Sequence, residues 1–140
     1  MASAARLYSP EVLALATSLA NWPLSADLPL TGSARSPACG SALTVGLALD
    51  AQGQIARIGL RAQACAIGQA AAALFAAHAV GTDRAAIAAT LTALDGWLTA
   101  SGPQPDWPGL DAIAPARDFP GRHGAMRLPW RAALEALPTA

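Results

Sequence analysis

The sequence contains no lysine and little charge of either sign. All nine basic residues are arginine, 13% of the 140 residues are charged, and the formal net charge is zero. Proteins that bind nucleic acid carry a basic run or a patch of basic and aromatic side chains. Neither is found here, so we expect no nucleic-acid partner. Because so few charges give little repulsion between copies, the composition favours self-association, for example as a homodimer.

Long apolar runs are missing as well. No stretch reaches the roughly 20 residues of a membrane span without Arg, Asp, Gly or Pro, and residues 1–6 lack the apolar region of a signal peptide. We therefore expect a cytoplasmic protein that does not enter a membrane. Cysteine is rare too, and the two residues present, Cys39 and Cys65, should be free thiols in a reducing compartment.

Apolar periodicity predicts an α+β fold in a single domain, residues 1–140, with a small antiparallel sheet of about three strands covered by helices. Apolar side chains alternate over 42–49 and again over 54–62, on either side of a turn, which is typical of a β-hairpin. A short edge strand is expected near 28–34. Helical spacing predicts one helix that begins at residue 10 and three more that cover 65–80, 82–99 and 126–137.

Four local expectations accompany these elements. Thr82 is predicted to cap the helix that follows it. Pro129 is predicted to lie in the first turn of the last helix, where a missing N–H is tolerated. His78 lies on the apolar side of its helix and is expected to pack in the core. Segment 102–120, rich in Pro and Gly, is expected to be an ordered loop that packs on the core.

The two cysteines flank the predicted hairpin. Cys39 precedes Gly40 and Ser41 at one end, and Cys65 lies among small residues at the other. We therefore expect the two sulfur atoms within about 8 Å of each other. Cys65 also falls where a helix begins, and there backbone N–H groups and the helix dipole stabilise a thiolate, so it should be the more reactive thiol. The alternative is that both cysteines are small buried apolar residues.

Five segments form a pattern that covers nearly the whole chain. They are Tyr8-Ser9-Pro10, Pro37-Ala38-Cys39-Gly40, Ala64-Cys65-Ala66-Ile67, Asp118-Phe119-Pro120-Gly121-Arg122 and Leu128-Pro129-Trp130-Arg131-Ala132. Together they resemble the U-type iron–sulfur cluster scaffold family, the group of IscU, SufU and the N-terminal domain of NifU. The spacing between the cysteines fits this family, and the long connection before the last helix is more like the SufU branch.

The resemblance implies a ligand set of one Asp and three Cys, and this chain departs from it at two positions. Ser41 stands where the family usually has Asp. An ungapped comparison places Ala125 at the third cysteine. Gly124 takes the position before it, which is often His or Lys in the family, and His123 comes one residue earlier.

The residues that remain imply a scaffold-like protein of iron–sulfur cluster assembly, which is a carrier more than an enzyme. Cys39 and Cys65 would bind iron or a transient cluster, with His123 as a third ligand, and Cys65 would accept a persulfide sulfur. Zinc and a [2Fe–2S] cluster both require four ligands. Zinc should therefore bind weakly, and two chains face to face would be needed to supply four cysteines. The implied partners are a cysteine desulfurase and acceptor apoproteins.

Two alternatives stay open. The chain could be a degenerate family member without metal that acts as an interaction or regulatory protein, which Ser41 and Ala125 favour. It could also be a sulfurtransferase that relays a persulfide without building a cluster, which the retention of Cys39 and Cys65 favours.

Overall fold

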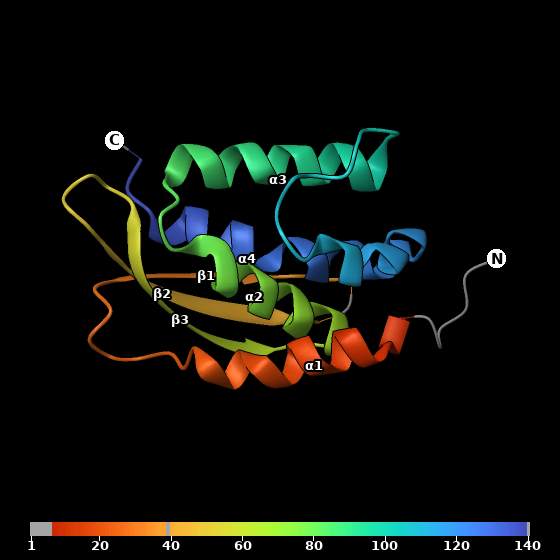
Figure 1. Ribbon diagram of the computed structural model, residues 1–140, viewed down its shortest axis with the longest axis horizontal. Coiled ribbons are helices and arrows are strands. Elements are labelled where there is room, and N and C mark those ends of the chain that lie inside the picture. Colours follow the sequence, from red (N-terminus) through yellow and green to blue (C-terminus); the bar gives the residue numbers. More distant parts are fainter. Residues whose placement is uncertain (1–6, 39, 140) are drawn as a thin grey trace.

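The computed structural model describes residues 7–38 and 40–139 and confirms the α+β architecture (Figure 1). Within these ranges, one sheet of three antiparallel strands packs with four α-helices. No helix of this part of the chain is long and apolar enough to cross a membrane. The strands are β1 (Leu30–Arg35), β2 (Ala42–Leu49) and β3 (Ile55–Gln63), and the helices are α1 (Pro10–Ser18), α2 (Ala66–Ala79), α3 (Arg84–Thr99) and α4 (His123–Ala136). Short 3-10 turns occupy Leu19–Asn21, Leu110–Ala112, Ala114–Asp118 and Pro120–Arg122.

The sheet has the order β1-β2-β3 and places its apolar face under two helices. The β2–β3 hairpin pairs Val45 with Leu60, in agreement with the predicted alternation, and both side chains are buried. Helices α2 and α4 cover this face, and α1 lies along α2 near β3 (Figure 1). Gly32 brings β1 directly onto α4, because a β-carbon there would collide with the Ala132 carbonyl oxygen. The sheet therefore sets where α4 lies.

Three aromatic rings join the long loop before α4 to two helices. Phe75 of α2 stacks on Trp107 with 5.3 Å between ring centroids, and Trp130 of α4 meets both rings edge-on at 5.2 and 5.3 Å. The Trp107 indole nitrogen also donates a hydrogen bond to the Leu74 carbonyl oxygen over 3.0 Å. Alanine-rich α2 leaves the space that these large rings fill. The loop thus packs on the core, as its sequence predicts.

The caps of α2 and α3 agree with the sequence in part. Cys65 is the N-cap of α2, as predicted. The predicted cap of α3 is wrong, because Asp83 and not Thr82 caps it, through a side chain that accepts a hydrogen bond from the Ala86 N–H over 2.9 Å. The Thr82 hydroxyl instead donates to the Ala79 carbonyl oxygen. Thr82 therefore closes α2 rather than opening α3.

Pro129 does not lie in the first turn of the last helix, contrary to the sequence prediction. The turn Pro120–Arg122 leads directly into α4 at His123, so the proline lies in the helix interior and cannot donate to the Ala125 carbonyl oxygen. An interior proline costs about 3 kcal/mol, whereas each large apolar side chain that becomes buried contributes about 1.5–3 kcal/mol. The loss is outweighed because α4 fully buries Met126, Leu128 and Trp130.

Two arginines tie α3 to α4. Arg84 donates to the carbonyl oxygens of Leu134 and Leu137, over 2.9 Å each, and so caps the C-terminal end of α4. Arg127 of α4 pairs with Asp95 of α3 at 2.5 Å between nitrogen and oxygen. The two helices are thereby fixed to each other at both ends of their contact.

Candidate functional site

Cys65 begins α2 as a free, half-buried thiol. Its backbone is extended, with φ of −63° and ψ of 170°, and its carbonyl oxygen accepts the first helical hydrogen bond, from the Gln69 N–H, over 2.9 Å. The Cys65 side chain itself accepts no hydrogen bond from the N–H groups of the first turn in this structure. A thiolate at the N-cap position is the anion that these donors and the helix dipole stabilise. The structure thus places Cys65 at the predicted helix start, and its reactivity stays a prediction.

Small residues bring the start of α4 against the start of α2. A β-carbon at Gly68 would lie 2.7 Å from the Ala64 β-carbon and 3.4 Å from the Ala125 β-carbon. Ala125 itself is fully buried. The position that the resemblance assigns to a third cysteine thus packs against Gly68, which is one helical turn along α2 from Cys65, and a methyl group stands there.

Gly124, the neighbour of Ala125, is packed against Ser36. A β-carbon at residue 124 would collide with the Ser36 hydroxyl oxygen and would lie 3.0 Å from the Ser36 β-carbon. Ser36 is 1% exposed. A longer side chain, such as the His or Lys expected from the family resemblance, has no room at this position unless Ser36 moves.

The segment around residue 39 is held at the same end of the sheet. The Ser36 N–H donates to the Ser41 carbonyl oxygen and the Gly40 N–H to the Ser36 carbonyl oxygen, over 2.8 Å each. Ala42 pairs with Gln63, two residues before Cys65. Cys39 itself lies outside the described residues, so the 8 Å separation of the two sulfur atoms stays a prediction. Ser36, Gly40 and Ser41 lie at the end of the hairpin from which the chain enters α2.

His123 is the first residue of α4, and one of its ring nitrogens is already engaged. Its Nε2 lies 2.7 Å from the Arg117 carbonyl oxygen. Because a carbonyl oxygen only accepts, Nε2 carries the proton of the neutral ring, and Nδ1 is the nitrogen left to bind a metal ion. No three His, Cys, Asp or Glu side chains gather as a metal site among residues 7–38 and 40–139.

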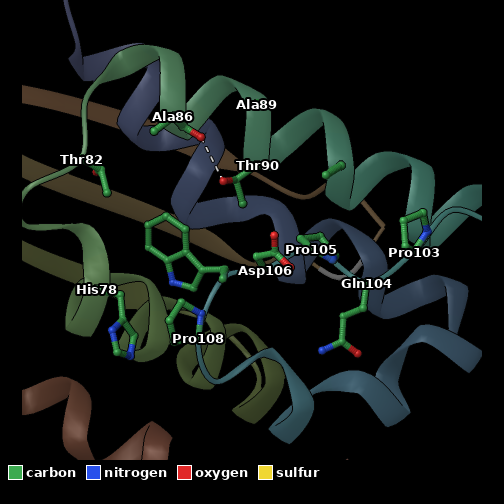
Figure 2. A pocket seen from close by; sticks show the side chains of 12 residues that line it. His78, Thr82, Ala86, Ala89, Thr90, Pro103, Gln104, Pro105, Asp106 and Pro108 are labelled. Atoms are coloured by element: carbon green, nitrogen blue, oxygen red, sulfur yellow. Dashed lines mark hydrogen bonds between the residues drawn. The ribbon is translucent and has the colours of Figure 1, made fainter.

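One cleft among the described residues lies away from these cysteine neighbours. It measures about 670 Å³ and is enclosed by the end of α2, one face of α3 and the loop 103–108, with Trp107 among its lining residues (Figure 2). His78 lines it and is exposed, so the prediction that His78 packs in the core is wrong. Since α2 rises about 1.5 Å per residue, this cleft is about 20 Å from Cys65.

Comparison with known proteins gives matches in structure but not in sequence. No protein-family model matches the chain, and no curated protein matches it significantly. The N-terminal part of a nitrogen-fixing NifU-like protein from Brucella abortus superposes with a TM-score of 0.84 and 25% identity, over 94% of this chain and 92% of that one. A protein of Fervidobacterium islandicum AW-1 is named as an iron–sulfur cluster assembly scaffold for the SUF system. It superposes with a TM-score of 0.79 and 15% identity, over 97% of this chain and 100% of that one.

Both likenesses extend over nearly the full length of each chain, so they include the sheet, the helix that Cys65 begins and the helix that carries Ala125. The same family was indicated independently by the sequence segments around the two cysteines. The shared fold therefore supports the resemblance to the U-type iron–sulfur cluster scaffold family.

Proposed function

We propose that this protein is a carrier in iron–sulfur cluster assembly that accepts sulfur at Cys65, holds iron or a cluster with the help of Cys39, and passes it to acceptor apoproteins. The observation that carries the proposal is the half-buried thiol at the start of α2, in a fold shared with two proteins that are named as NifU-like and as a SUF scaffold. Sulfur, iron and the cluster are the cargo of this reaction rather than a resident cofactor.

The sulfur step at Cys65 is a transfer between two thiols without net oxidation. The Cys65 thiol loses its proton to solvent, and the thiolate attacks the outer sulfur of a persulfide on a cysteine desulfurase. A bond forms between Cys65 Sγ and that sulfur, and the bond to the desulfurase cysteine breaks, so that the electron pair leaves on the desulfurase thiolate. The position of Cys65 at the N-terminus of α2 places the attacking thiolate at the positive end of the helix dipole.

The metal step would use fewer ligands than a closed site has. Cys39 and Cys65 supply two thiolates, and His123 would supply Nδ1 as a third ligand. Four ligands complete tetrahedral zinc or a [2Fe–2S] cluster. We therefore expect iron or a cluster to be held transiently and zinc to bind weakly to one chain, which suits a carrier that must release its cargo.

The test uses protein purified without oxygen and incubated with a cysteine desulfurase, cysteine and ferrous iron. We expect mass spectrometry to find the added sulfur on Cys65, and iron and acid-labile sulfide to accumulate on the protein. Cys65→Ser should lose both signals, whereas Cys39→Ser should keep the persulfide and lose the iron. Ala64→Ser is the matched control beside the thiol and should behave as the parent protein does.

Each outcome decides between the candidates. Sulfur on Cys65 with no iron on the parent protein would favour a persulfide-relaying sulfurtransferase. Sulfur on Cys39 alone, or on neither cysteine with no cluster formed, would refute the carrier role.

A specific observation favours a second function, that of a family member that binds partners without metal. The side of the site where the resemblance places a third ligand is filled by the contacts of Ala125 with Gly68 and of Gly124 with Ser36. Such packing keeps the fold and its surface while leaving no thiol there. This candidate predicts that the protein binds a desulfurase equally well after both cysteines are changed to serine.

A further inference from the structure

Strand β1 forms one edge of the sheet, and its hydrogen-bonding pattern shows which of its peptide groups face outward. The Ser36 N–H donates to the Ser41 carbonyl oxygen, so this pair is hydrogen-bonded. Hydrogen-bonded and non-bonded pairs alternate in an antiparallel ladder. The peptide groups of Gly32 and Ala34 therefore face β2, and those of Thr31, Ser33 and Arg35 face away from the sheet.

The two edges of the sheet differ in how they are covered. At the β3 edge, the Leu60 N–H donates to the Trp22 carbonyl oxygen, and Pro23 forms a bridge with Leu60. Among the described residues no strand pairs with the outer edge of β1, where the Arg35 carbonyl oxygen accepts a hydrogen bond from Arg131 over 3.0 Å. An open edge strand without Lys or Pro is a template for another strand.

A recess runs beside this open edge and separates it from the helices. It has a volume of about 340 Å³ and lies between β1, α3 and α4. Half-buried Leu134 and Leu91 line it, and exposed Arg131 and Glu135 stand one helical turn apart along α4. Arg84 of α3 also lines the recess and is bound to the carbonyl oxygens of Leu134 and Leu137. The exposed face of α4 therefore adds one positive and one negative side chain to an apolar middle.

The order of these two charges along the strand is fixed by the packing of α4. Gly124, near the start of α4, contacts Ser36 at the end of β1, and Gly32 contacts Ala132 and Ala136 near the end of the helix. Helix and strand thus run in opposite directions. Arg131 lies toward the Arg35 end of β1, and the charge of Glu135 lies toward the other end.

We propose that β1 is the docking edge for a second copy of this chain, paired antiparallel with its own β1 about a twofold axis at Ser33. The peptide groups of Ser33 would bond to those of the second Ser33, and those of Thr31 to Arg35. The twofold axis exchanges the two ends of the strand. It therefore sets Arg131 of each copy opposite Glu135 of the other, with Leu134 near the axis, so that the edge is complementary to itself in charge.

The outer face of the strand supports the same register. The hydroxyl groups of Ser33 and Thr44 lie 2.9 Å apart on adjacent strands. In the dimer the two Ser33 side chains are directly opposite, which extends this pair into a row of four hydroxyl groups across the joined sheets. Low net charge adds no repulsion to the approach of two copies.

This dimer does not unite the cysteine sites. Ser36 lies about 10 Å along the strand from Ser33 at 3.3–3.4 Å per residue, so the twofold axis places the two Ser36 residues about 20 Å apart. The six-stranded sheet of the dimer therefore has the two sites at opposite ends of its paired β1 strands, one site in each copy. The proposal does not rest on the proposed function, because β1 contains none of the candidate sulfur or metal ligands.

The first test removes one outward-facing N–H of β1 and leaves the hydrogen bonds between β1 and β2 in place. Ser33→Pro deletes the donor at the axis, and a proline is tolerated on an edge strand whose N–H faces solvent. We expect the parent protein to show a concentration-dependent dimer by sedimentation equilibrium and Ser33→Pro to be monomeric, with circular dichroism confirming that the variant is folded. Ser33→Ala keeps the N–H and loses only the hydroxyl group, so it should still dimerise.

The second test exchanges the charges on the exposed face of α4. Arg131→Glu and Glu135→Arg should each weaken the dimer. Residue 131 of each copy faces residue 135 of the other, so each single variant creates two pairs of like charges. A mixture of these two single variants should form a heterodimer, and the double variant R131E/E135R should dimerise again with itself. A parent protein that is monomeric throughout the concentration range, a dimer that Ser33→Pro leaves intact, or charge variants that fail to pair with each other would overturn the proposal.

Discussion

Ala125 of α4 faces Gly68 of α2, with 3.4 Å between the Ala125 β-carbon and the place that a β-carbon would take at Gly68. Two helix N-termini meet here at a distance that only small side chains allow. Cys65 begins one of the helices and His123 the other. The contact is therefore what keeps the candidate ligands of the two helices at one end of the fold.

Enlarging Gly124 should loosen this end of the protein. Gly124→Ala places a methyl group against buried Ser36, and overpacking of this kind costs about 1–3 kcal/mol in the free energy of unfolding. Urea denaturation measures the loss. Gly121→Ala is the control, since a β-carbon there meets nothing within 4 Å, and it should change stability by no more than about 0.5 kcal/mol. Equal stability of the two variants would contradict the packing described for Ser36.

Adding a thiol at Ala125 should strengthen metal binding. Ala125→Cys supplies a third thiolate at the start of α4, beside the start of α2, and a zinc site gains stability with each sulfur ligand. We expect zinc to bind roughly tenfold tighter or more, because even the loss of an outer-shell partner changes metal affinity by 10–100-fold. Isothermal titration at neutral pH measures this. Ala125→Ser matches the size of cysteine with a poor ligand and should bind zinc as the parent protein does.

Gly32 should be intolerant of any side chain. Gly32→Ala would drive a methyl group into the Ala132 carbonyl oxygen and against Ala136, which are backbone atoms that cannot turn away, so we expect a loss of about 3 kcal/mol or failure to fold. Gly96→Ala is the contrast, because space is open there and alanine favours the helix by about 0.5–1 kcal/mol. A thermal melt that ranks the two variants the other way would refute the close contact of β1 with α4.

Asp27 should titrate below its usual range. A hydrogen bond from the Ser25 hydroxyl, and then one from Arg57 over 2.7 Å, lower the pKa of this exposed carboxyl from 3.8. The folded state thus holds the proton less tightly than the unfolded chain does. Its stabilising effect is present above the unfolded pKa and is lost as the pH falls through the folded pKa. In an NMR titration, Ser25→Ala should raise the pKa of Asp27, and Arg57→Gln should raise it less. An unchanged titration in Ser25→Ala would contradict the role of that hydroxyl.

Short-range patterns in the sequence predict the sheet and the start of α2, and the structure shows why. The alternation through Val45 and Leu47 survives because one face of the hairpin is buried and the register is then fixed. Cys65 was expected at a helix start and is the N-cap of α2. Both features depend on residues that are near one another along the chain.

The contacts that shape the site could not be predicted in this way, because they join residues that are far apart in the sequence. Nothing around Gly124 indicates that Ser36 will fill the space beside it. Burial of His78 could not be judged from periodicity either, since α2 is apolar on nearly all sides and the pattern does not show which arc is covered. Pro129 was misplaced because tertiary burial of α4 outweighs the local cost of a proline.

The contacts among Phe75, Trp107 and Trp130 give this protein an optical reporter of the contact between α2 and α4. Trp130 lies on the helix that carries Ala125, and Phe75 lies on the helix that Cys65 begins. Separation of the two helices would open the ring contacts and admit water to an indole that is now fully shielded. Intrinsic tryptophan emission should therefore shift to longer wavelength when α4 separates from α2, without any label.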